Sequence, residues 1–139
     1  MNKICTSIEQ SKKLIELGID VNTADMYYWH GSHRLLRVND GKCEDIDVPA
    51  WSLSALLELI PKHIKQEDSR IYKFHIVNDD GIVIKRWNCS YIAEDYHNRA
   101  EYLSDPNLTY PTNIYGGKNE NVLDAVFEMI VYLKENKLI

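Results

Sequence analysis

The chain has 139 residues, a size at which folding buries one sizeable hydrophobic core. With 45% hydrophobic and 27% charged residues, it lacks the low-hydrophobicity, high-charge composition of disordered chains. Sixteen Lys and Arg against 21 Asp and Glu give a net charge of −5, and no basic stripe stands out, so binding of double-stranded nucleic acid is disfavoured. We therefore predict one folded domain spanning residues 1–139.

The spacing of the cysteines and the hydropathy of the chain indicate which cellular compartment and which cofactors are expected. Cys5, Cys43 and Cys89 are widely spaced and none lies in a Cys-x-x-Cys arrangement, which disfavours a disulfide framework and a structural zinc site. No segment approaches the ~18 apolar residues of a membrane span, and no apolar stretch follows the N-terminal charge as in a secretory signal. We expect a cytoplasmic protein with no membrane partner, no metal and no cofactor.

The first predicted element is a helix over residues 7–17. Ser7 and Gln10 stand at the spacing of a capping box, in which each side chain binds the other residue's backbone amide. Gly18 can adopt the left-handed conformation that ends a helix.

Two strands and a second helix are predicted next. Residues 26–30 and 34–38 are rich in aromatic and β-branched side chains and are joined across Gly31 and Ser32, which predicts a strand pair. Apolar residues then recur at the spacing that places them on one helical face. They are Leu53, Leu56, Leu57 and Ile60, with Ser52 as cap and Pro61 as stop.

The middle of the chain contains the clearest hairpin signal. Residues 71–77 alternate apolar and polar side chains, and a second strand over residues 82–91 follows a turn rich in Asn, Asp and Gly. A short helix is predicted over residues 92–103, and residues 107–118, with two prolines and two adjacent glycines, are predicted to form a long loop.

The last predicted element is a helix that starts near Asn121. Apolar residues cover most of its sides and leave a narrow polar strip at Asp124, Glu128 and Glu135, so this helix should be largely buried. The elements together predict an α+β fold in which antiparallel hairpins pack against a buried C-terminal helix and shorter helices.

Three motifs suggest chemistry, and each has a plainer interpretation. His30 and His33 could reach one metal ion, but zinc needs three or four ligands, so we interpret them as partly exposed turn histidines. Cys5 and Cys89 lack a catalytic signature and fit small core residues. Gly116, Gly117 and Lys118 precede the last helix, where an anion could bind, but a hinge is favoured. We predict no catalytic residue and no metal site.

The aromatic residues are the most informative feature for function. Nine Tyr and three Trp against two Phe mean that nearly every ring carries a hydrogen-bonding group, as at protein interfaces and base-stacking platforms. Several rings stand beside Arg or Lys, which suits a flat partner with negative charge. The predicted ligand-binding residues are Tyr28, Trp29, His33, Arg34, Arg37, Arg86, Trp87 and Lys118.

Three pieces of the sequence, in the same order, carry a resemblance to a known group. They are residues 5–11 continuing to 23–26, residues 49–57, and residues 124–130. These pieces resemble a family of small, uncharacterised proteins of Bacteroidetes phages and mobile elements. The resemblance implies a genomic setting, and it brings no assigned activity and no catalytic residues.

Three classes of function follow as hypotheses. The first is a non-catalytic accessory protein of a phage or mobile element that binds a host protein or a small nucleotide-like ligand. A more specific version of this hypothesis is a role in counter-defence. The second is a small metal- or His-dependent hydrolase or nuclease built from His30, His33, His97 and scattered carboxylates. The third is a structural or assembly protein that acts as a homo-oligomer. The first requires Tyr and Trp rings that lie partly outside the core.

Overall fold

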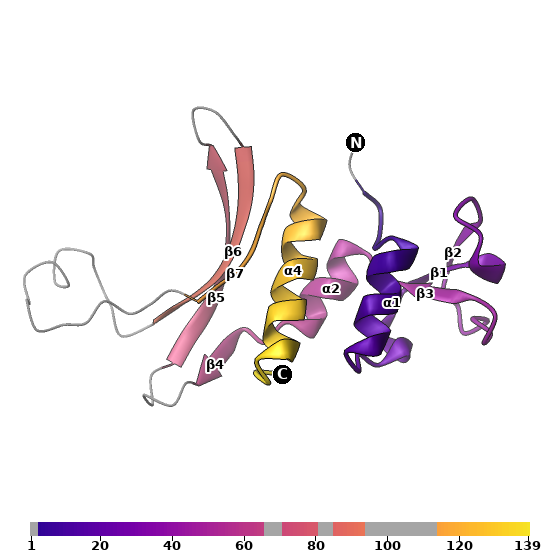
Figure 1. Cartoon of the computed structure of the whole chain (residues 1–139), viewed down its shortest axis with the longest axis horizontal. Helices are drawn as coiled ribbons and strands as arrows, with labels where there is room; N and C mark the ends of the chain where they lie inside the picture. Colours follow the sequence, from indigo (N-terminus) through magenta and orange to yellow (C-terminus); the bar gives the residue numbers. More distant parts are fainter. Residues whose placement is uncertain (1–2, 66–70, 81–84, 94–113) are drawn as a thin grey trace, which may run out of the picture.

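A computed structural model describes residues 3–65, 71–80, 85–93 and 114–139 of the chain (Figure 1). Its helices are α1 (Ile8–Glu16), α2 (Leu53–Leu59) and α4 (Val122–Glu135), with short 3-10 turns η1 (Val21–Thr23) and η2 (Trp29–Gly31). The strands form two antiparallel sheets, so the predicted α+β class is confirmed. In these parts of the chain, no helix has the length and apolar character needed to cross a membrane.

The helix starts follow the local signals in the sequence. Ser7 Oγ accepts the Gln10 amide at 3.1 Å and Gln10 Oε1 accepts the Ser7 amide at 2.9 Å, which completes the predicted capping box of α1. Ser52 caps α2, and Asn121 caps α4 by accepting two backbone amides. Three of the four predicted helix starts are therefore confirmed.

The smaller sheet consists of β1 (Met26–Tyr28), β2 (Leu36–Val38) and β3 (Val48–Ala50), in the order β2-β1-β3. The predicted strand pair is confirmed, with Tyr27 opposite Arg37, although the first strand ends two residues earlier than expected, at η2. Strand β3 was not predicted because it contains Pro49. Proline has no N–H to donate, and it is tolerated here because β3 is an edge strand.

The larger sheet has the order β4-β5-β6-β7, and its centre is the predicted hairpin. Its strands are β4 (His63–Lys65), β5 (Ile71–Asp80), β6 (Lys85–Ala93) and β7 (Ile114–Asn119). Two predictions are wrong here. The helix predicted over residues 92–103 is instead strand at its first two residues, because β6 continues to Ala93, and the rest lies outside the described residues. Residues 114–118 of the predicted loop belong to β7, and residues 107–113 are not described.

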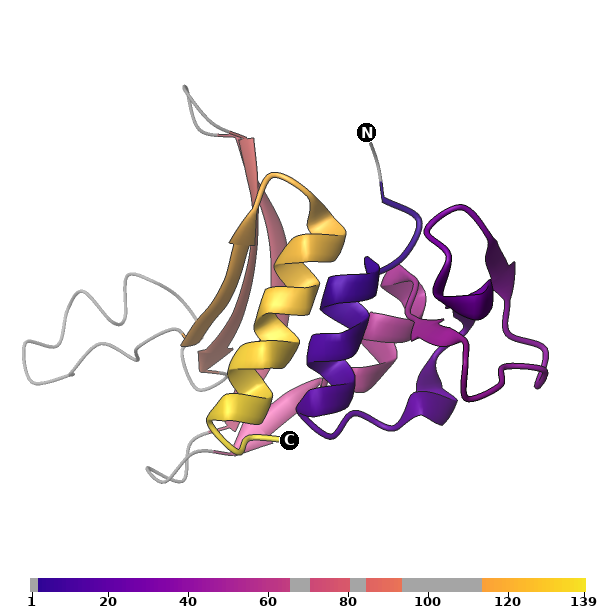
Figure 2. The ribbon, with the colours of Figure 1, turned by 45° about the vertical axis from the view of Figure 1, so that its right-hand side comes forward.

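The core lies between the larger sheet and the helices (Figure 2). Helix α4 packs on β6 and β7 and also against α2, and six of its residues are buried, which confirms the prediction of a buried C-terminal helix. Trp51 is fully buried and its indole N–H donates to Thr23 Oγ1 at 2.9 Å. In both views the helices separate the larger sheet from the smaller one.

Strand β7 and helix α4 approach each other closely at Gly117. A methyl group placed on Gly117 would lie 1.9 Å from the backbone oxygen of Ala125, far inside van der Waals contact. The second of the two adjacent glycines is therefore required by packing, and it lies in a strand where the sequence suggested a hinge. Only a residue without a side chain allows the helix to approach the strand this closely.

Replacing Gly117 with Ala should lower the free energy of unfolding by about 3 kcal/mol, because backbone atoms of strand and helix would have to separate. The control is Gly41→Asn, a site with positive φ and open space around it, where Asn is tolerated and the loss should stay below about 1 kcal/mol. Urea unfolding followed by circular dichroism measures both values. Equal losses would contradict this account of the packing.

Candidate functional site

The predicted ligand-binding residues fall into two groups at opposite ends of the molecule (Figure 1). The first group lies on and between β1 and β2 and comprises Tyr28, Trp29, His33, Arg34 and Arg37. The second group lies on β6 and β7 and comprises Arg86, Trp87 and Lys118. Helices stand between the groups, so the eight residues do not form one site.

Two side chains, Arg37 of the first group and the neighbouring His30, stack on the ring of Trp29. The Arg37 guanidinium carbon lies 4.7 Å from the centroid of the Trp29 ring, in cation–π geometry, and the Trp29 ring stacks on the His30 ring with centroids 3.9 Å apart. Trp29 is half-buried, whereas His30 and Arg37 are exposed. We call these three residues the Trp29 cluster.

The neighbours of the Trp29 cluster divide into a structural residue and two exposed ones. The Tyr28 hydroxyl donates to the Thr6 carbonyl at 2.9 Å, and burial raises the pKa of Tyr28 well above its ordinary value. This ring therefore ties β1 to the N-terminal segment. His33 and Arg34 are exposed in the segment that links η2 to β2, beside the Trp29 cluster in the chain.

In the second group, the Trp ring is attached to the hydrophobic core. Trp87 is partly buried and packs against the core, while Arg86 is exposed. Lys118 lies in β7 opposite Asn88 of β6, and it does not precede the α4 start as a hinge residue would. The fully buried Trp51 and Tyr91 belong to the core. Partly exposed Trp rings thus exist in both groups, and the cation–π contact found among the described side chains belongs to the first group.

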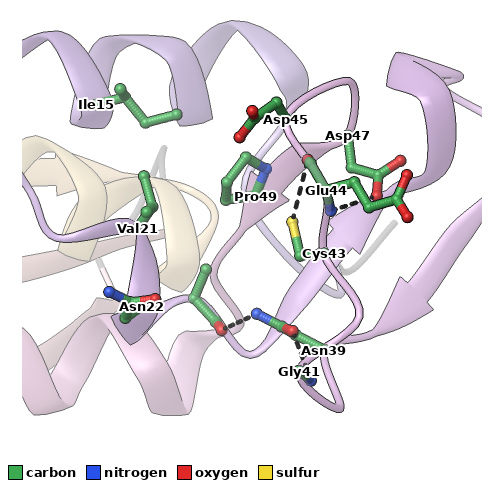
Figure 3. A pocket seen from close by; sticks show the side chains of 11 residues that line it. Ile15, Val21, Asn22, Asn39, Gly41, Cys43, Glu44, Asp45, Asp47 and Pro49 are labelled. Atoms are coloured by element: carbon green, nitrogen blue, oxygen red, sulfur yellow. Dashed lines mark hydrogen bonds between the residues drawn. The ribbon is translucent and has the colours of Figure 1, made fainter.

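A pocket that the sequence did not predict lies beside the smaller sheet (Figure 3). Its volume is about 490 Å³, and its lining includes apolar residues and three acidic ones. The lining residues are Ile15, Val21, Asn22, Ala24, Asn39, Gly41, Cys43, Glu44, Asp45, Asp47 and Pro49. Acidic residues at 44, 45 and 47 were the available signal in the sequence. Because these charges repel phosphate, the pocket does not suit a nucleotide.

Asp47 connects the pocket to the Trp29 cluster. Its carboxylate accepts the backbone amides of Glu44 and His30, each at 2.8 Å, and these two bonds lower the pKa of Asp47. His30 has a positive φ of 52°, which is uncommon for a residue with a side chain. The Asp47 carboxylate therefore holds His30, and with it the stacked ring, against the loop that lines the pocket.

The described residues contain no arrangement suited to metal or thiol chemistry. No group of three His, Cys, Asp or Glu side chains that could hold a metal occurs among them, and His97 lies outside them. Burial is the main cause that raises the pKa of the Cys89 thiol to about 12, and it also raises the pKa of Cys5 and Cys43. A raised pKa keeps these thiols protonated at neutral pH and weakens them as nucleophiles.

Comparison of the chain with protein-family models, with curated proteins and with solved structures finds no match.

Replacing Asp47 with Asn should lower the thermal midpoint at pH 7 and weaken the pH dependence of stability. The folded-state pKa of Asp47 is lowered, so its charge contributes fully above the unfolded pKa near 3.9, and the contribution is lost as the pH falls through the folded pKa. The gap between wild type and variant should therefore close as the pH falls below about 4.

The matched control is Asp45→Asn, because Asp45 is exposed and lines the same pocket. Thermal scans of all three proteins between pH 7 and pH 3 make the comparison. The account would be contradicted if the difference in thermal midpoint between wild type and Asp47→Asn stayed constant across this range, or if Asp45→Asn showed the same difference. Either result would show that the negative charge of Asp47 is not what makes its two amide bonds stabilising.

Proposed function

We propose that this protein is a non-catalytic binding protein that acts in the cytoplasm as an accessory of a phage or mobile element. Its partner is a host protein, which contacts the Trp29 cluster, and counter-defence is the role that fits this setting. The observation that carries the proposal is the half-buried Trp29 ring with the exposed Arg37 guanidinium stacked 4.7 Å from its centroid. Trp and Arg are the residues most enriched among those that dominate binding energy at protein interfaces.

The surroundings favour a protein partner over a nucleotide-like ligand. A nucleotide site would combine a concave surface, a stacked ring and several cations that meet in space. The pocket beside the smaller sheet is instead lined by carboxylates, and the Trp29 cluster is not part of its lining. An open surface with one anchored ring and exposed Arg34 and His33 beside it is typical of contacts between proteins.

The double variant Trp29→Ala and Arg37→Ala should lose its partner. Wild type and variant, immobilised at equal density, are exposed to a Bacteroidetes lysate, and bound proteins are quantified by mass spectrometry. One protein held by wild type should fall at least about 30-fold on the variant, the equivalent of about 2 kcal/mol for a central Trp or Arg. The control Lys65→Ala and Leu57→Ala removes an exposed cation and an exposed apolar side chain elsewhere, and should retain the partner.

Equal retention of every captured protein by the double variant would overturn the proposal. Titration calorimetry against cyclic and ADP-ribose-derived nucleotides tests the alternative that the ligand is a nucleotide. No heat is expected with any of them, and heat that disappears in Trp29→Ala would assign the surface to a nucleotide in place of a protein.

A further inference from the structure

We infer that the partner binds by adding an extended, acidic segment to the open edge of β2, as a fourth strand of the smaller sheet. This inference rests on the proposed function, because β2 contains Arg37 of the Trp29 cluster. The residues that precede β2 in the chain connect it to Trp29. Strand addition of this kind gains affinity from main-chain hydrogen bonds and specificity from alternate side chains.

The hydrogen-bond pattern shows which groups of β2 are open. Arg37 is opposite Tyr27, and the flanking bonds join Trp29 N–H to the Leu35 carbonyl and Asn39 N–H to the Asp25 carbonyl. In an antiparallel ladder bonded pairs alternate, so Arg37 bonds to β1 while Leu36 and Val38 direct their N–H and C=O groups away from it. Strand β2 is at the edge of its sheet, and within the described part of the chain no strand pairs with that side.

The edge is protected only in part. Natural edge strands are shielded by short length, by charged side chains, by Pro, by a bulge or by a covering segment, and β2 has the first two, a length of three residues and the charge of Arg37. Here Val38 exposes 72% of its surface and Leu35 exposes 41%, and the register of β2 with β1 contains no bulge. Because β2 has only three residues, an added strand can form main-chain hydrogen bonds only with Leu36 and Val38. Side-chain contacts are therefore also needed for affinity.

The charge beside the edge identifies the kind of segment that fits. Arg37 lies at the centre of β2 and Arg34 lies two residues before the strand, and both are exposed. Neither forms an ion pair among the described residues. A residue of the added strand directly opposite Arg37 would occupy a non-bonded pair, in which side chains approach most closely. An Asp or Glu at that position would lie opposite the positive charge of Arg37, and opposite charges stabilise cross-strand pairs.

The same geometry disfavours a second copy of this chain as the occupant. Symmetric antiparallel pairing of two β2 edges through Leu36 and Val38 would place Arg37 directly opposite Arg37 of the other copy. Like charges directly opposite each other destabilise a strand pair. The edge is therefore better suited to an acidic segment of a different protein.

The test uses a random peptide library displayed on phage and panned on the wild-type protein, followed by synthesis of the enriched peptides. These peptides should be rich in Asp and Glu, and should bind at least tenfold more weakly to Arg37→Glu. They should also bind at least tenfold more weakly to Val38→Pro, which removes an outward N–H that β1 does not use. N-methylation of alternate peptide amides should abolish binding without any change to the protein.

Amide hydrogen exchange gives a direct readout of the bonds. With an enriched peptide bound, exchange at the Leu36 and Val38 amides should slow at least tenfold. Unchanged exchange at these two amides, equal affinity for Val38→Pro, or a library that yields no acidic binder would overturn the inference.

The two proposals can fail separately. A host protein that is lost on Trp29→Ala and retained by Val38→Pro would leave the proposed function intact and reject strand addition. Retention by both variants would reject both proposals. Light scattering that shows a dimer in wild type and a monomer in Val38→Pro would assign the edge to a second copy of the chain.

Discussion

The contact between the backbones of Gly117 and Ala125 sets the distance between β7 and α4, and the rest of the core follows from it. Among the described elements, helix α4 contributes the largest set of buried side chains, and it packs on the larger sheet and on α2. Ser52, the cap of α2, donates its backbone amide to the Asp25 carboxylate at 2.8 Å. The smaller sheet is thus joined through α2 to the helix that the larger sheet positions.

The larger sheet is covered by α4, and its inward residues such as Cys89 and Tyr91 are fully buried. Polar bonds connect the smaller sheet and its loops to neighbouring segments, including those of Asp25 to Ser52, Tyr28 to Thr6 and Asp47 to His30. A sheet held by such bonds can leave aromatic and cationic side chains outside the core, which is the condition that a binding surface requires.

The sequence predicted best those elements whose signals are local. Ser7, Ser52 and Asn121 identified the helix starts because a cap is a contact between near neighbours, and alternating side chains identified the central hairpin. Strand β7 was missed because the need for Gly117 comes from α4, a tertiary contact that turn propensity cannot express. Strand β3 was missed because it contains Pro49. A proline is tolerated in a strand at the edge of a sheet, and the position of β3 at the edge is known only from the topology.

The candidate site was predictable only in part, for the same reason. Trp29 and Arg37 could be assigned to one surface because Trp29 directly follows β1, and a short connection joins β1 to β2, which contains Arg37. Arg86, Trp87 and Lys118 were grouped with them by residue type, and the topology places these three in the other sheet. The acidic pocket depends on how the loop after β2 folds over Pro49, which residue composition does not reveal.

Photo-crosslinking tests the claim that the Trp29 cluster is the binding surface most directly. A benzophenone amino acid introduced in place of His33, beside the cluster, should crosslink to one host protein, whereas the same group in place of Lys65 on the larger sheet should not. A crosslink from position 65 and none from position 33 would contradict the account.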